Sequence, residues 1–110
     1  MEIYKPAEPW YVGMTQSSRD PTPTCVAAKL GMQAVLMAVY APTQYQTKWT
    51  CMLAHGRGKY EAELPNVNPN DDSPETWRKA QADAIDAITK QLEAEIQWRQ
   101  DAIKSLQNLK

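Results

Sequence analysis

The residues best suited to catalysis are one histidine and two cysteines. His55 is the only histidine in the chain, and Cys25 and Cys51 are the only thiols. A cysteine beside a histidine can act as a nucleophile, so catalysis would require one of the two thiols to contact His55. His55 lies in a glycine-rich turn, where an imidazole is ordinarily solvated. We therefore expect no nucleophilic site and no enzyme activity.

Metal and phosphate binding are also poorly supported by the spacing of the polar residues. Two cysteines and one histidine match no zinc pattern, because a structural zinc ion needs four ligands. The acidic pair Asp71 and Asp72 is explained by helix capping, and Asp83 and Asp86 by a solvated helical face. The glycines at 56 and 58 lack the spacing of a phosphate-binding loop. We expect no cofactor and no metal.

Nucleic-acid binding is the alternative function that the basic residues suggest. Lys48, His55, Arg57 and Lys59 gather on a predicted hairpin and its tip, where they could contact phosphates. A hairpin before a helix also occurs in double-stranded-RNA-binding folds. Those folds have basic residues at the start of the final helix, whereas this chain has acidic ones there. The net charge of −1 also lacks the basic excess that is typical of such proteins.

The composition indicates one small globular domain covering residues 1–110. Apolar residues make up 43% of the 110 residues, which is enough for a core without staples. Two cysteines are too few for a disulfide framework, so we expect reduced thiols, with a single bridge as the alternative. The chain shows no signal peptide, and its longest apolar run, 34–40, is far short of the ~20 residues that span a bilayer. We therefore expect a cytoplasmic protein that does not bind membranes.

The first 22 residues are predicted to form an extended, proline-rich arm. Proline fixes φ and removes a hydrogen-bond donor, so the prolines in this stretch prevent one regular element. The stretch 10–14 is its only strand candidate. Trp10 and Tyr11 are of the types that anchor interfaces, so we assign them to partner binding, with packing against the core as the alternative.

Residues 23–41 favour a buried helix. Thr22 can cap it, Pro23 suits its first position, and Pro42 ends it. The residues between are rich in alanine, leucine and methionine, which is typical of a helix buried over most of its circumference. A buried strand over 33–40 is the alternative, because periodicity cannot separate the two in so apolar a run.

Residues 44–65 predict a β-hairpin. Apolar and polar side chains alternate from Tyr45 to Leu53 and again from Lys59 to Leu64, which indicates strands with one buried face. The glycines of the turn 55–58 permit the tight connection between them. The fold class that follows is α+β: a small antiparallel sheet, with a third strand as an option, packed with the buried helix and a long final helix.

The final helix is predicted over 74–108. Ser73 can cap it, Pro74 suits its first position, and neighbouring acidic residues complement the positive end of its dipole. No proline or glycine follows within it. At about 1.5 Å per residue it would be roughly 50 Å long, whereas a compact domain of about 100 residues has a radius of gyration near 13 Å. The helix must therefore project, bend or pack along a partner.

The final helix carries more apolar surface than a small domain needs. A stripe that begins with Trp77, Ile85, Ile88 and Leu92 is expected to pack on the domain itself in its first half. Little remaining chain could cover the second half, whose apolar positions and one interrupting arginine we assign to partner binding. These partner-binding residues are Ile96, Trp98, Arg99, Ile103 and Leu106. An antiparallel dimer would bury them, and a frayed tail is the alternative.

These features favour a non-enzymatic protein-interaction module that self-associates through its final helix, as a homo-oligomer and in particular a dimer. Its partner would be another protein, and the alternative is a small nucleic-acid-binding protein that uses the hairpin tip 55–59. The small size and simple architecture would suit a phage or mobile-element accessory protein that binds or inhibits a host macromolecule.

Overall fold

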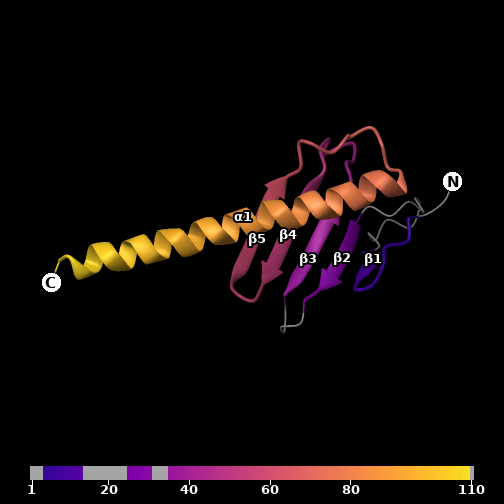
Figure 1. Ribbon diagram of the computed structural model, residues 1–110. Coiled ribbons are helices and arrows are strands. Elements are labelled where there is room, and N and C mark those ends of the chain that lie inside the picture. Colours follow the sequence, from indigo (N-terminus) through magenta and orange to yellow (C-terminus); the bar gives the residue numbers. More distant parts are fainter. Residues whose placement is uncertain (1–3, 14–24, 31–34, 110) are drawn as a thin grey trace.

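The computed structural model describes residues 4–13, 25–30 and 35–109. It contains five strands followed by one long helix (Figure 1). The elements are β1 (Trp10–Gly13), β2 (Cys25–Lys29), β3 (Leu36–Tyr40), β4 (Thr50–His55), β5 (Gly58–Glu63) and α1 (Pro74–Gln107).

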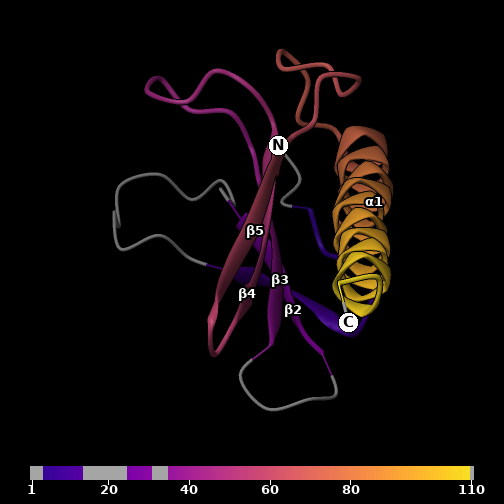
Figure 2. The same cartoon turned by 90° about the vertical axis from the view of Figure 1, so that its left-hand side faces the viewer.

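The strands form one antiparallel sheet in the order β1-β2-β3-β4-β5, so each strand pairs with its neighbours in the sequence. Figure 2 shows that α1 lies along one face of this sheet. We call this the helix face and the other the opposite face. The predicted α+β class is therefore confirmed, and the third strand that the sequence left optional is part of a five-stranded sheet.

The buried helix predicted over 23–41 is wrong, because the described part of this stretch forms β2 and β3. The alternative, a strand over 33–40, holds from Leu36 to Tyr40. Ala27 on β2 and Ala38 on β3 point to the opposite face, yet they are only 4% and 1% exposed. Strands that are buried on both faces read as continuous apolar runs, so the alternation that marks a strand was missing. The predicted cap at Thr22 and Pro23 lies outside the described residues.

The predicted hairpin is confirmed, but its first strand begins later than expected. β4 starts at Thr50, and Tyr45 is 89% exposed in the preceding loop. The hydroxyl oxygen of Thr43 accepts hydrogen bonds from the backbone N–H groups of Tyr45 and Gln46, which makes this stretch a local turn. Gly58 ends the hairpin turn with φ at +154°, a conformation that other residues rarely adopt.

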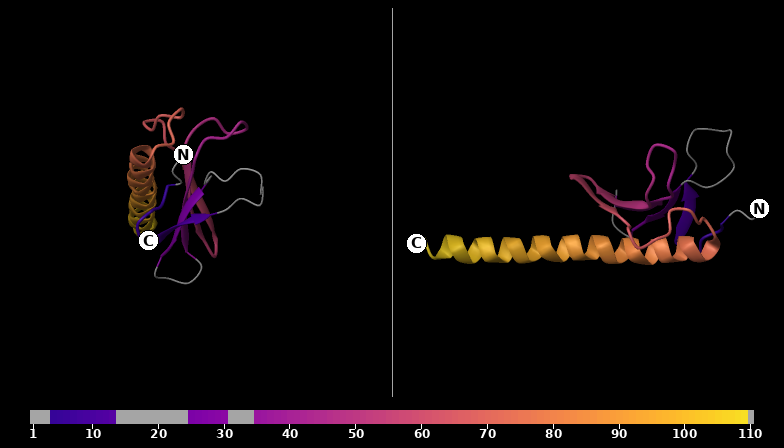
Figure 3. Two further views of the ribbon diagram at one scale, coloured as in Figure 1. Left: turned by 90° about the vertical axis from the view of Figure 1, so that its right-hand side faces the viewer. Right: turned by 90° about the horizontal axis from the view of Figure 1, so that it is seen from above.

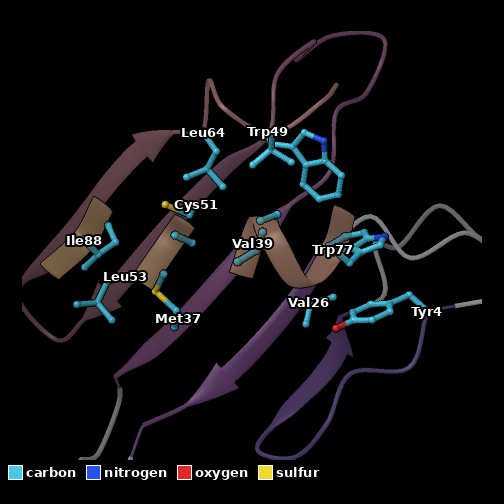
Figure 4. Close-up of a cluster of buried hydrophobic side chains, with 13 residues drawn as sticks. Tyr4, Val26, Met37, Val39, Trp49, Cys51, Leu53, Leu64, Trp77 and Ile88 are labelled. Carbon is cyan, nitrogen blue, oxygen red and sulfur yellow. The ribbon is translucent and has the colours of Figure 1, made fainter. Parts of the chain in front are cut away.

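The core lies between the helix face and the first half of α1 (Figure 4). The cross-strand register aligns Val12, Val26, Val39, Cys51 and Ala62 in one row on this face. Val26 and Val39 are fully buried, and Cys51 is almost so. Side chains two residues along the same strands, including Met37 and Leu53, form a second row.

An aromatic cluster fixes the start of α1 on the sheet. The ring of Trp77 stacks on Tyr4 with a centroid distance of 5.6 Å and meets Trp49 edge-on at 4.7 Å. The indole N–H of Trp49 donates to the carbonyl oxygen of Asn68 at 2.8 Å, and the Tyr4 hydroxyl donates to Oε1 of buried Gln81 at 2.5 Å. Tyr4 thus joins the amino-terminal arm to the core.

The predicted helix start is confirmed at Ser73, whose hydroxyl oxygen accepts from the backbone N–H of Thr76. Asp71 reinforces this cap. Its carboxylate accepts from the Thr76 hydroxyl at 2.6 Å and from the backbone N–H of Ser73 at 3.0 Å. These hydrogen bonds hold the pKa of Asp71 below its usual value. The helix then runs without interruption to its carboxyl-terminal cap at Asn108.

Candidate interaction surface on the long helix

The second half of α1 extends beyond the sheet. The helix packs against β3, β4 and β5, crosses the β5 edge and continues away from the body (Figures 1 and 3). The described structure measures 64 × 29 × 25 Å, and its radius of gyration of 16.9 Å exceeds the ~13 Å of a compact domain of this size. We call residues 96–109 the projecting segment.

The projecting segment continues the apolar face that the first half buries. Residues 18 apart on an α-helix are separated by about five full turns and therefore point in the same direction. By this rule Trp98 corresponds to Ala80, Ala102 to Ala84 and Leu106 to Ile88. The three earlier residues are each at most 4% exposed against the sheet.

The large apolar side chains of the projecting segment are exposed. The exposed fractions are 56% for Ile96, 68% for Trp98, 57% for Ile103, 63% for Leu106 and 81% for Leu109. A side chain of this size buries on the order of 100 Å², so together they offer about 500 Å² of apolar surface. A patch of several hundred Å² on a small monomer is typical of an interaction site.

One residue of the first half departs from the predicted stripe. Ile85 was expected to pack on the domain, but it is 50% exposed. The helix presents Trp77, Ala84 and Ile88 to the sheet, and Ile85 lies on the flank of that face. Ile103 occupies the same flank about five turns later. The exposed edge therefore begins before the helix leaves the sheet.

A polar junction holds α1 where it passes the β5 edge. The Tyr60 hydroxyl on β5 donates to the Glu95 carboxylate, which also accepts from Arg99 at 2.7 Å. The Gln91 side-chain amide donates to the backbone oxygen of Glu61 at 2.8 Å, so the helix also caps the strand edge. The Tyr60 bond lowers the pKa of Glu95 and raises that of Tyr60.

A hollow of about 280 Å³ lies at this junction, at the base of the projecting segment. Side chains of β5 and α1 line it together, and Leu92 and Ile96 contribute apolar surface. Its lining residues are Tyr60, Leu92, Glu95, Ile96 and Arg99. The hollow thus joins two of the predicted partner-binding residues, Ile96 and Arg99, to residues of the body.

The two aromatic residues of the amino-terminal arm point in opposite directions from β1. Trp10 lies on the helix face and packs against the core cluster, as the alternative reading of the sequence proposed. Tyr11 lies on the opposite face and is 43% exposed. The structure therefore does not join Trp10 and Tyr11 into one surface, and neither lies on the projecting segment.

Two lysines of the predicted nucleic-acid site are paired with carboxylates. The Lys48 ammonium lies 3.3 Å from Glu63, and that of Lys59 lies 2.9 Å from Glu61. Such pairing lowers the positive potential that phosphate binding requires. The remaining two residues are at the hairpin tip. His55 faces the Tyr60 ring at 5.6 Å and accepts, through Nδ1, from the backbone N–H of Arg57.

Both thiols are free and lie on different faces of the sheet. Cys51 is 2% exposed on the helix face, and Cys25 is partly buried on the opposite face. Burial raises the pKa of each thiol, which favours the unreactive protonated form. Within the described ranges, no three His, Cys, Asp or Glu side chains are grouped as metal ligands would be.

A second hollow, of about 480 Å³, lies over β3, β4 and β5. Tyr40, Thr50 and Met52 contribute to it from the opposite face, together with Glu61 and Glu63. Both carboxylates are paired with the lysines described above.

In the part of the chain that the structure describes, no helix has the length and apolar character needed to cross a bilayer.

Sequence reasoning placed five of its partner-binding residues on the projecting segment and missed the rest of this surface. Leu109 was left out of the predicted site, although it is the most exposed large apolar residue of the segment. Tyr60 and Glu95 are 35 positions apart, and neither residue type signals their contact. The apolar stripe along the helix could be read from the sequence, whereas this contact could not.

Comparisons with known proteins add no relative. The chain matches no protein-family model, no curated protein and no solved structure. The projecting segment and its hollow therefore provide the evidence from which a function can be argued.

Proposed function

We propose that this protein is a non-enzymatic protein-interaction module that self-associates through the projecting segment of α1. One observation carries the proposal: the helix face that is buried against the sheet continues as an exposed apolar face beyond β5. An exposed patch of this size costs solubility unless a partner covers it.

The area is sufficient for a specific interface. If two copies each bury about 500 Å², the pair buries about 1,000 Å², which is the lower limit for a stable biological interface. Trp98 would be the main anchor, since tryptophan is enriched among the residues that dominate binding energy. Trp10 packs against the core, so the proposal rests on the helix rather than on the amino-terminal arm.

Two further features support the proposal that the protein is non-enzymatic and cytoplasmic. Burial keeps Cys51 protonated, which makes it a poor nucleophile, and it lies in the core rather than beside solvent. Free thiols also suit a reducing compartment, so we place the protein in the cytoplasm.

Light scattering coupled to size separation tests the proposal. The parent protein should show a mass above the 12.4 kDa of one chain, and Trp98→Glu should return it to that mass. Gln97→Glu is the matched control, because it places the same charge on the solvent side of the helix. Circular dichroism checks that both variants remain folded. A mass of one chain at high protein concentration would contradict the proposal.

A further inference from the structure

We propose that the projecting segments of two copies pack antiparallel about a two-fold axis at Ala102, with Leu109 of each copy seated in the hollow of the other. The inference rests on the proposed self-association and adds its partner, orientation and register. Four observations carry it: the spacing of the apolar residues, the position of the hollow, the charges on the packing face, and the room beyond β5.

The apolar residues are arranged symmetrically about Ala102. Trp98 lies four positions before it and Leu106 four positions after it, on the same side of the helix. A two-fold axis at Ala102 therefore places Trp98 of one copy against the partner's Leu106, and the reverse. Alanine at the crossing point lets the axes approach to about 8 Å, the short end of helix–helix distances.

The hollow lies at the distance that this register requires. Glu95 lies seven positions before Ala102, and Leu109 lies seven positions after it. In the antiparallel pair, Leu109 of one copy therefore reaches the level of the partner's Glu95. The hollow there offers apolar surface from Leu92 and Ile96. Leu109 is 81% exposed, so its own chain leaves this side chain largely in solvent.

The charges on the packing face favour the antiparallel orientation. Glu95 and Arg99 flank the direction of Leu106 on the apolar side of the helix, and they are paired with each other. A parallel pair would place Arg99 beside the partner's Arg99 and Glu95 beside the partner's Glu95. The antiparallel pair places Arg99 opposite the partner's Ser105 instead, so no like charges meet.

The body leaves room for the second copy. The sheet ends near Glu95, where Tyr60 of the edge strand contacts the helix. From Glu95 to the level of the partner's Glu95 the helix spans 14 residues, or about 21 Å. The two bodies therefore lie at opposite ends of the helix pair. Figure 3 shows that the projecting segment stands clear of the sheet.

Distances between spin labels on the solvent side of the helix test the orientation and register. Labels at cysteines introduced at Lys90, Gln97 and Lys104 are measured one at a time in the full chain, in a Cys25→Ser background because Cys51 is buried. In the proposed pair, the separation along the axis between the two labels grows by about 3 Å for each residue of distance from Ala102, since each copy contributes about 1.5 Å. The axial separations are then about 6 Å at Lys104, 15 Å at Gln97 and 36 Å at Lys90. The measured distance combines each of these with a nearly constant separation across the pair, so it increases in the order Lys104, Gln97, Lys90.

The outcomes separate this inference from the function beneath it. Equal separations at all three positions would mean a parallel pair, and axial separations that extrapolate to zero at a residue other than 102 would mean another register. Either result overturns the inference while self-association stands. No measurable separation, together with a mass of one chain, would overturn both.

A pair of charge variants tests the hollow. Leu109→Asp should raise the dissociation constant by about tenfold or more, because it removes an apolar side chain from a buried position. Asn108→Asp adds the same charge at the same end of the helix but on its solvent side, so it should change the constant far less. Equal effects of the two variants would show that Leu109 is not seated in the partner.

Discussion

Ala80 and Trp98 extend from α1 in the same direction, about five turns apart, yet one is fully buried and the other is 68% exposed. The sheet accounts for this difference, since it covers the first half of α1 and the projecting segment extends beyond it (Figure 1). The relationship shows that α1 has one apolar face and that the sheet covers only half of it. It also predicts opposite responses to substitution at the two positions.

Ala80→Leu should destabilise the folded chain by about 1–3 kcal/mol, because added methylene groups at a fully buried position force neighbours apart. Trp98→Leu should leave the free energy of unfolding of the single chain nearly unchanged. Urea denaturation at low protein concentration, where association is minimal, measures both. Equal losses of stability would contradict the division of the helix into two halves.

The long helix was predictable because its signals are local. Ser73 and Pro74 mark its start, and an uninterrupted apolar face with matching polar residues continues to the end of the described chain. Each signal depends on neighbours within one or two turns, so no knowledge of the tertiary structure is needed. The same signals predicted the exposed second half, since they showed more apolar surface than a small core can cover.

The helix predicted over 23–41 was wrong because tertiary burial removed the pattern that identifies strands. Ala27 and Ala38 are buried on the face where a surface strand would carry polar residues. Alanine is also a good helix former, so local propensity favoured the wrong element. The hollow beside Tyr60 could not be predicted either, because it depends on where α1 crosses β5.

Trp77→Ala should destabilise the protein by about 3–5 kcal/mol, since it removes a large buried ring and leaves a cavity. The ring contacts both Tyr4 and Trp49, so the amino-terminal arm should also loosen. Denaturant unfolding gives the stability, and proteolysis near Tyr4 reports the arm. Trp98→Ala is the matched control and should change the unfolding free energy of the single chain by no more than about 0.5 kcal/mol.

Asp71→Asn should remove a pH-dependent part of the stability. The Thr76 hydroxyl and the Ser73 N–H hold the pKa of Asp71 below its unfolded value, so the ionised form favours folding. This contribution to stability is complete at pH values above the ordinary pKa of aspartate. It is lost as the pH falls through the lowered pKa of Asp71. Denaturation midpoints at pH 7 and pH 3 should therefore differ less in Asp71→Asn than in the parent. Asp72→Asn serves as the control, and an identical pH response of Asp71→Asn and the parent would argue against the cap.

The two thiols should react slowly with a thiol-specific reagent at neutral pH. Burial raises the pKa of both, and Cys51 is additionally shielded at 2% exposure. Cys25, which is partly buried, should react first, and Cys51 only when the protein unfolds. Labelling of Cys25→Ser isolates Cys51. Rapid labelling of that variant in the folded state would contradict the burial of Cys51 and favour a nucleophilic site near His55.

Tyr60→Phe should alter the titration of Glu95. The hydrogen bond from the Tyr60 hydroxyl is the main cause of the lowered pKa of Glu95, and Arg99 adds to it. Without the hydroxyl, the pKa of Glu95 should rise toward its ordinary value, although Arg99 should keep part of the shift. Titration of the Glu95 side chain by NMR measures this change.

The Tyr60 hydroxyl also holds the helix to the β5 edge, so amide hydrogen exchange around Ile96 should be faster in Tyr60→Phe. Tyr45→Phe is the control, because Tyr45 is 89% exposed in a loop. A Glu95 titration that matches the parent would show that the β5 edge does not hold α1 where the projecting segment begins.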